Sequence, residues 1–107
     1  METKNALTAL AALAQETRLA VFRLLVETGP EGLPVGKIGE RLSIAPATLS
    51  FHLKELAHAD LVTMRHEGRF IYCSASFATM NNLLAYLTEN CCGGNAPAYV
   101  CSPVPPL

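Results

Sequence analysis

The fold of this 107-residue chain is decided by a stretch in its middle, PATLSFHLKELAH at residues 46–58. Leu49, Leu53 and Leu56 recur at intervals of three and four, which is the spacing of one face of an α-helix. Pro46 can open this helix, because the first helical position has no use for its backbone N–H. A helical wheel points five other side chains outward or to the flanks: Ala47, Thr48, Ser50, Phe51 and Lys54. We therefore predict a helix that is apolar inside and mixed outside.

Similar periodicity predicts four more helices around this one. They are expected at about residues 4–13, 16–27, 35–42 and 76–90. The second is ended by Thr28-Gly29-Pro30, because glycine suits a helix cap and proline cannot continue the helix. Ser43-Ile44-Ala45 then forms a tight turn between the third helix and the fourth.

Two short strands are predicted at Leu61 to His66 and Arg69 to Ser74, joined around Glu67-Gly68 as a hairpin. Four helices, a hairpin and a fifth helix make a winged helix-turn-helix, a mainly α fold of the α+β class with five helices and a β-hairpin wing. We assign this domain to residues 1–90. Proline and glycine after that point predict a flexible, cysteine-containing tail over residues 91–107.

The first and fifth predicted helices carry more apolar surface than a chain of this size can cover. The fifth has a broad stripe made of Phe77, Met80, Leu83, Leu84 and Leu87. Large apolar patches are uncommon on monomers in water. We therefore predict a homodimer that forms through the first and fifth helices.

Composition narrows the class of protein. The chain is 50% hydrophobic and 16% charged with a net charge of −1, so any nucleic-acid binding depends on where the charges lie. Neither a run of 18 apolar residues nor a secretion signal is seen, which predicts a cytoplasmic protein without a membrane partner. The four cysteines are then expected to be thiols.

Three of these cysteines, Cys91, Cys92 and Cys101, fall within eleven residues of the predicted tail. Thiolates select soft ions. Three sulfurs complete the coordination shell of As(III) or Sb(III), whereas structural zinc takes four ligands. We predict a metalloid site on these three residues, within one subunit or shared between two. Methylated As(III) needs only two sulfurs, so Cys91 and Cys92 could bind it alone. The fourth, Cys73, lies in the second predicted strand and is expected in the core.

The outward face of the 46–58 helix would enter the major groove of double-stranded operator DNA. Thr48 and Ser50 can bond base edges or phosphates, and Lys54 can meet a phosphate. Phe51 has two interpretations: contact with a thymine methyl group, or packing against the third helix. Arg65 and Arg69 flank the wing tip and are placed to reach the DNA backbone or minor groove.

These segments resemble the ArsR/SmtB family of bacterial metal-responsive repressors. Residues 15–25, QETRLAVFRLL, are similar to the second helix of that family, and residues 47–56, ATLSFHLKEL, to its recognition helix. Residues 59–62, ADLV, and 65–72, RHEGRFIY, are similar to its wing. The resemblance covers residues 5 to about 90. It implies a homodimer that binds an operator without ligand and releases it when a metal or metalloid binds.

Departures from the family limit the ligand site. Arsenic repressors of the best-known type carry Glu-Leu-Cys-Val-Cys-Asp-Leu-Cys at the third helix, but residues 32–39 here read GLPVGKIG. Zinc-responsive members use aspartate and histidines on the fifth helix, and residues 76–90 contain neither. The tail cysteines resemble those of arsenic-responsive members whose ligands lie at the C-terminus.

The favoured function is thus an arsenite- or antimonite-responsive repressor. Three alternatives remain: a methylarsenite-selective repressor, a redox or sulfide sensor that uses disulfide exchange, and an enzyme with a thiol tail. The enzyme is the weakest, because no histidine or carboxylate lies near the cysteines in sequence to activate them. We expect no enzymatic activity and no organic cofactor.

Overall fold

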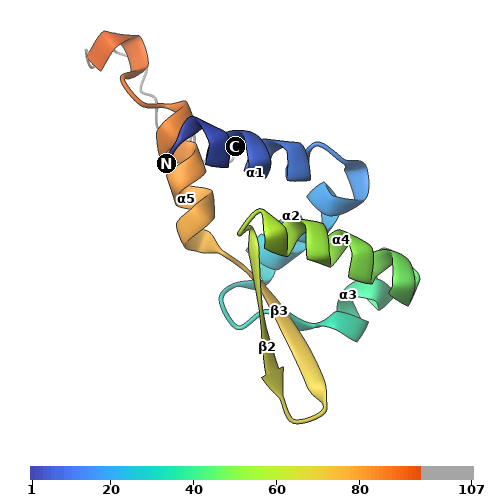
Figure 1. Cartoon of the computed structure of the whole chain (residues 1–107). Coiled ribbons are helices and arrows are strands. Elements are labelled where there is room, and N and C mark those ends of the chain that lie inside the picture. The colour runs from blue at the N-terminus through green and yellow to red at the C-terminus, as the bar shows by residue number, and fades with distance from the viewer. Residues whose placement is uncertain (95–107) are drawn as a thin grey trace, which may run out of the picture.

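The computed structural model describes residues 1–94, and its elements follow one another as five α-helices, three strands and a final 3₁₀ turn (Figure 1). The helices are α1 (Thr3–Leu13), α2 (Glu16–Thr28), α3 (Val35–Leu42), α4 (Pro46–His58) and α5 (Phe77–Leu87). The strands are β1 (Leu33–Pro34), β2 (Val62–Glu67) and β3 (Phe70–Ala75), and the 3₁₀ helix η1 spans Cys91–Gly94.

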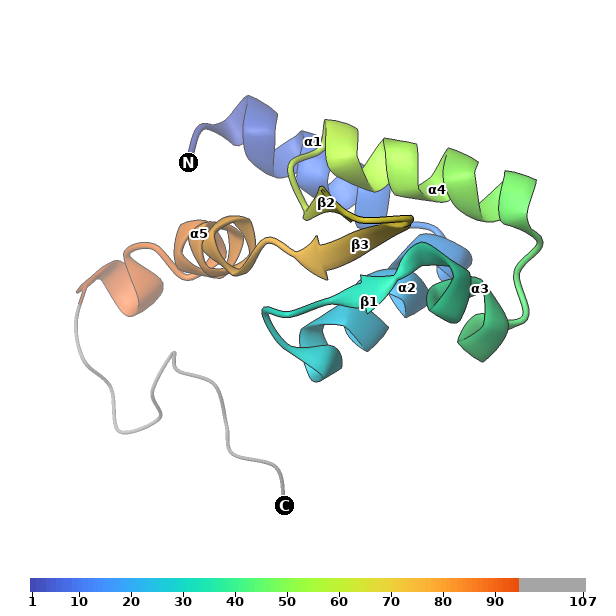
Figure 2. The same ribbon diagram turned by 90° about the horizontal axis from the view of Figure 1, so that it is seen from below.

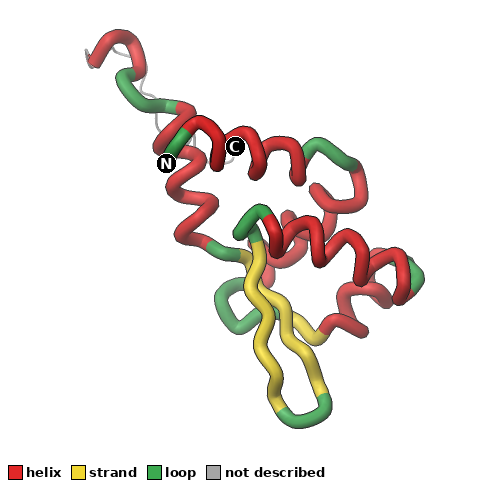
Figure 3. Tube along the Cα trace, viewed as in Figure 1, coloured by secondary structure: helices red, strands yellow, loops and turns green. Residues whose placement is uncertain are grey.

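The sheet lies between two groups of helices. Its strand order is β1-β3-β2, and both pairings are antiparallel. Figure 2 shows α4 on one side of the sheet and α2 and α3 on the other, with α5 set apart from the body. The hairpin of β2 and β3 projects away as the wing (Figure 3). This arrangement is the winged helix-turn-helix that the sequence predicts.

The core sits where α2, α4 and the sheet meet. Leu25, Leu56 and Leu61 are completely buried there. The predicted inner face of α4 is confirmed, because Leu49 and Leu53 are at most 2% exposed. Burying each such side chain contributes roughly 1.5–3 kcal/mol.

Several details differ from the sequence prediction. Both wing strands begin and end one residue later than expected, so Gly68 and Arg69 make the turn, with Gly68 at a φ of 61°. The two-residue strand β1 was not predicted, because it is too short for an alternating pattern to show. It depends on Gly32, whose φ is 72° and where a Cβ would stand 2.4 Å from the Cys73 carbonyl oxygen.

Helix α1 turns an unexpected face toward the core. Its buried residues are Ala6, Ala9 and Ala12, while Leu7 is 61% exposed and Leu10 39% exposed. Alanine has no side chain beyond Cβ, so it lets the α1 backbone approach its neighbours closely. Leu7 and Leu10 are therefore left for some other surface.

Candidate nucleic-acid interface and thiol cluster

Helices α3 and α4 form the helix-turn-helix. Ser43 ends α3 in the left-handed conformation with a φ of 54°, and the N–H of Ile44 donates to the Gly39 carbonyl at 2.9 Å. Ala45 is extended at the start of α4, and Pro46 is its first residue. The tight turn predicted at residues 43–45 is therefore present. With this turn, α3 lies behind α4 and α4 presents one face outward.

All five residues predicted for the outer face of α4 are exposed: Ala47, Thr48, Ser50, Phe51 and Lys54. Phe51 is 56% exposed, so it is not packed away against α3. Its ring instead meets the ring of His52 edge-on, with centroids 5.3 Å apart. The face therefore offers two hydroxyls, one ammonium group and one aromatic ring to a ligand.

His52 lies on the inner side of the same helix and is only 9% exposed. Its Nδ1 is 3.3 Å from Nη1 of Arg18 on α2. This histidine therefore bonds within the protein, at the edge of the core. No local pattern identifies Arg18 as its partner, because the two residues lie 34 positions apart.

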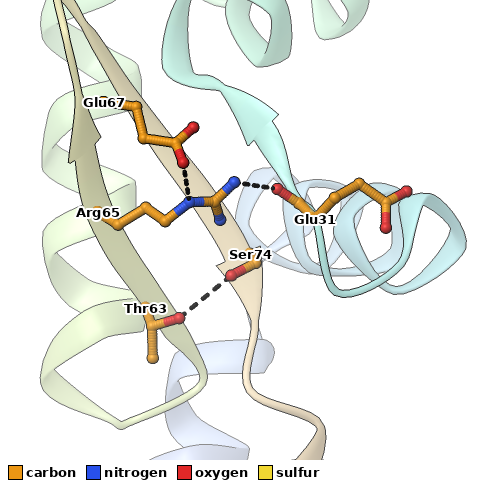
Figure 4. A network of polar contacts seen from close by, with 5 residues as sticks. All are labelled: Glu31, Thr63, Arg65, Glu67 and Ser74. Atoms are coloured by element: carbon orange, nitrogen blue, oxygen red, sulfur yellow. Dashed lines mark hydrogen bonds and ion pairs between the residues drawn. The ribbon is translucent and has the colours of Figure 1, made fainter.

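The wing is fastened to the body through Arg65 (Figure 4). Its Nη2 donates to the Glu31 carbonyl oxygen at 2.8 Å, and its Nε lies 3.4 Å from Oε1 of Glu67. The guanidinium carbon also stands 4.8 Å from the centre of the Tyr72 ring, within cation–π range. Arg65 is therefore held by three protein groups, which favours a role in positioning the wing over the predicted DNA contact.

Other polar residues of the wing differ in exposure, from Ser74 at 9% to Arg69 in the exposed turn. Thr63 and Ser74 are hydrogen-bonded across the two strands at 3.2 Å (Figure 4). Arg69 is exposed in the turn, next to Phe70, which is 59% exposed. Arg69 is thus the wing cation best placed to meet a phosphate.

Charge on this side of the molecule is partly neutralised within the protein. Residues 35–70 hold five basic and four acidic side chains. Lys37 lies 3.8 Å from Glu40, and Arg65 pairs with Glu67. In the part of the chain that the structure describes, no ion pair involves Arg41, Lys54 or Arg69. Within residues 1–94, these three cations are therefore not neutralised by an acidic partner.

The cysteine pair follows α5 closely. Cys91 and Cys92 open η1, and their sulfur atoms lie 3.8 Å apart. Cys92 is free and exposed, with a left-handed φ of 54°. Cys91 is disulfide-bonded, which differs from the expectation of four thiols. The third predicted ligand, Cys101, lies outside the described residues. Within residues 1–94 no group of three or more potential metal ligands occurs.

Cys73 is buried in β3, as predicted, and is 0% exposed. Burial raises the pKa of its thiol from 9.0 to about 12, because the thiolate is poorly solvated there. This thiol is therefore a core group and a poor ligand.

Similar proteins agree with this geometry. Residues 13–65 match the helix-turn-helix domain family. The chain is 38% identical over 78 residues to YceK of Bacillus subtilis (strain 168), an uncharacterized HTH-type transcriptional regulator, and the match covers 73% of this chain and 77% of YceK.

Solved structures are similar as well. An ArsR-like transcriptional regulator from Rhodococcus sp. RHA1 is 26% identical with a TM-score of 0.70, over 81% of this chain and 78% of that one. A possible transcriptional regulator for arsenical resistance is 28% identical with a TM-score of 0.66, over 76% of this chain and 81% of that one.

Two further findings bear on the kind of protein. Within residues 1–94, every helix is too short or too polar to cross a bilayer. Helix-turn-helix transcriptional regulators bind DNA and are not enzymes. The helix-turn-helix, the wing and the relatives lead to one assignment: the chain belongs to the HTH-type transcriptional regulators, and its structure is similar to that of an ArsR-like member.

Proposed function

We propose that the protein is a homodimeric repressor that leaves its operator when tail thiolates bind As(III) or Sb(III). The observation that carries this proposal is the pair of adjacent cysteines just beyond α5, with sulfur atoms 3.8 Å apart. At a metal–thiolate bond length of about 2.3 Å, both sulfurs can reach one ion placed between them. The pair is thus spaced like two ligands of a single ion.

The third ligand in this proposal is Cys101, which completes the three-sulfur shell of a trivalent metalloid. Methylated As(III) is the alternative ligand and needs Cys91 and Cys92 alone. A relative described as a possible regulator for arsenical resistance supports the arsenic assignment. Disulfide-bonded Cys91 must first be reduced, so the metalloid-binding form is the thiol form.

Operator binding would use α4 and the wing. Thr48, Ser50 and Phe51 are exposed side chains suited to base edges and to a thymine methyl group. Lys54 and Arg69 are exposed cations suited to phosphates. One copy offers few charges, so firm binding requires two half-sites roughly 34–36 Å apart and a dimeric protein.

The dimer would form on the outer face of α1 and α5. Leu7 and Leu10 on α1, and Leu84 and Leu87 on α5, are between 39% and 61% exposed. The two helices are joined at one end by a 2.6 Å hydrogen bond between the hydroxyls of Thr3 and Tyr86. A second copy would remove these leucines from water, which supports the predicted interface.

Ion binding would be coupled to DNA release because η1 follows closely after α5, one of the two proposed dimerisation helices. Leu87 ends α5, and Cys91 begins η1 four residues later. An ion bound by the tail cysteines would reorganise the end of a dimerisation helix and change the relative position of the two α4 helices. The metalloid must bind more tightly to the arrangement that cannot hold DNA, because only differential binding shifts the equilibrium.

The test is fluorescence anisotropy on a duplex that the protein itself enriches from a random-sequence pool. Arsenite is added under phosphine reductant to wild type and to the Cys91→Ser, Cys92→Ser and Cys101→Ser variants. We expect wild type to release DNA and each variant to retain it, with Cys73→Ala as a responsive control. A response to methylarsenite that survives Cys101→Ser would identify the methylated ligand instead. Normal release by all three serine variants would exclude the tail site.

A redox sensor is the second candidate, and the disulfide-bonded state of Cys91 favours it. Free Cys92 lies 3.8 Å from that sulfur and could take part in thiol–disulfide exchange. A redox sensor would release DNA when a disulfide oxidant is added without arsenite, and a phosphine would restore binding. An arsenite sensor would release DNA while the phosphine is present.

A further inference from the structure

Arg18 joins three helices through one guanidinium group. Its Nε donates to the carbonyl oxygen of Ala12, in the last turn of α1, at 2.7 Å. Its Nη1 lies 3.3 Å from Nδ1 of His52 on α4. A guanidinium has donors and no acceptor, so Nδ1 of His52 is the acceptor in this contact.

The contact continues to the outer face of α4. The His52 ring meets the Phe51 ring at 5.3 Å and an interplanar angle of 63°. His52 is 9% exposed and Phe51 is 56% exposed. The buried histidine therefore stands between Arg18 and the aromatic side chain that α4 offers to DNA.

The partners of Arg18 include no carboxylate among the described residues. No acidic side chain of residues 1–94 lies within ion-pair distance of it, although Glu55 and His58 line the same hollow between α1, α2 and α4. Its two partners accept from different nitrogens, the Ala12 carbonyl from Nε and His52 from Nη1. The fixed fork of the guanidinium satisfies them together, which the single ammonium of lysine could not do with the same geometry.

We propose that Arg18 is a positioning residue for DNA recognition. It ties α4, through His52, to the end of α1, and thereby fixes how α4 presents Phe51 to the major groove. This inference rests on the proposed DNA interface of α4. It adds a link from α1, the proposed dimerisation helix, to the DNA-reading helix.

The experiment is a double-mutant cycle on DNA affinity, without arsenite. Arg18→Lys keeps the charge but loses the fork, and His52→Phe keeps a ring beside Phe51 but loses the acceptor. Each single variant and the double variant are titrated onto the enriched duplex at several salt concentrations. Arg23→Lys is the matched control, because Arg23 is an exposed arginine on the same helix.

We expect each single variant to bind on the order of tenfold more weakly, and the double variant to bind about as weakly as the worse single one, because contacting residues are not additive. The dependence of log Kd on log salt stays as in wild type, since no phosphate contact is lost. Arg23→Lys binds like wild type.

Three results would overturn the proposal. They are single variants within twofold of wild type, losses that multiply in the double variant, and a salt slope that falls by about one in Arg18→Lys, which would make Arg18 a phosphate ligand. If Arg18→Lys does not fold, the His52→Asn variant provides the test, because the amide oxygen of asparagine can accept in place of Nδ1. Tighter DNA binding by His52→Asn than by His52→Phe supports the proposal. Equal or weaker DNA binding contradicts it.

The proposed arsenite response can fail independently. A wild-type protein that binds DNA but ignores arsenite would remove the metalloid proposal and leave the Arg18 cycle intact. If wild type responds normally to arsenite while the Arg18 and His52 variants bind DNA like wild type, the Arg18 proposal falls and the metalloid proposal stands.

Discussion

The two halves of the molecule differ in how far their leucines are buried. The DNA-reading half holds α4 and the wing, and the outer half is formed by α1 and α5. In α4, Leu49, Leu53 and Leu56 are at most 2% exposed. In α1 and α5, by contrast, Leu7 and Leu87 are more than half exposed. The first half is closed by its own core, and the second has apolar surface left over. An amphipathic pattern therefore identifies a helix with an apolar face, but does not say whether that face meets the same chain or another.

The two halves also differ in their thiols, and the largest expected effect concerns this difference. Burial raises the pKa of Cys73 to about 12, so at pH 8 its thiolate fraction is about one in ten thousand. Cys92 is exposed at the end of the outer half. After reduction, a thiol reagent should label Cys92 on the order of a thousandfold faster than Cys73, because the thiolate is the reactive form. Peptide mass spectrometry over time measures both rates.

The same burial gives a pH dependence with a definite sign. The folded-state pKa of Cys73 is raised, so its contribution to stability is complete below pH 9 and is lost as pH rises toward 12. Cys73→Ala should lack this component of alkaline destabilisation. Rapid labelling of Cys73 in the folded protein would mean that β3 is not closed over it.

Leu56→Ala should produce the next largest effect. Leu56 is 0% exposed, and its truncation leaves a cavity in the core, so the free energy of unfolding should fall by about 2–5 kcal/mol. Urea denaturation followed by circular dichroism measures this loss. Phe70→Ala on the wing is the control, since Phe70 is 59% exposed and should change stability by less than about 0.5 kcal/mol. Equal losses would contradict the division between core and surface.

Leu87→Glu addresses the outer half. Leu87 is 55% exposed, so the folded monomer tolerates a charge there, but a dimer interface would bury that charge twice by symmetry. We expect the dimer dissociation constant to rise on the order of a hundredfold, because a buried unpaired charge is costly. Sedimentation shows the change, with the circular dichroism spectrum unaltered. Met64→Glu, at an exposed apolar site of the wing, should leave the dimer intact.

How far the sequence predicts this molecule depends on how local each feature is. The bounds of α3 and α4 are as predicted, because leucine spacing, Pro46 and the turn residues all act within a few positions. Strand β1 and the contact between Arg18 and His52 were not predicted. They join residues that are far apart in the chain, and no local pattern marks such pairs.

The wing shows the same limit for a site residue. Arg65 and Arg69 look equivalent in sequence, since both flank the hairpin turn. Only the structure reveals that Arg65 is held by Glu31, Glu67 and Tyr72. Charge can be read from sequence, but its engagement by other protein groups cannot.

Salt dependence can separate these two arginines. Arg69→Gln should lower the slope of log Kd against log salt by about one, because it removes the proposed phosphate contact. Arg65→Gln should weaken binding only a few-fold and leave the slope unchanged, because its guanidinium positions the wing. Anisotropy titrations at four salt concentrations give both slopes. A reduced slope for Arg65→Gln would mean that Arg65 contacts a DNA phosphate after all.

The smallest expected effect concerns how helices begin in the two halves. Ser76 caps the start of α5, because its hydroxyl accepts from the backbone N–H of Thr79, whereas Ala45 before α4 provides no such cap. Ala45 already has the extended conformation of a capping residue, with φ −63° and ψ 145°. Ala45→Ser should therefore stabilise the protein by about 0.5–1 kcal/mol, while Ser76→Ala should lose a similar amount. Thermal unfolding of both variants measures this. If Ala45→Ser raises stability and leaves DNA affinity unchanged, the missing cap has no role in DNA binding. A gain that weakens DNA binding would mean that the start of α4 must move when it meets the groove.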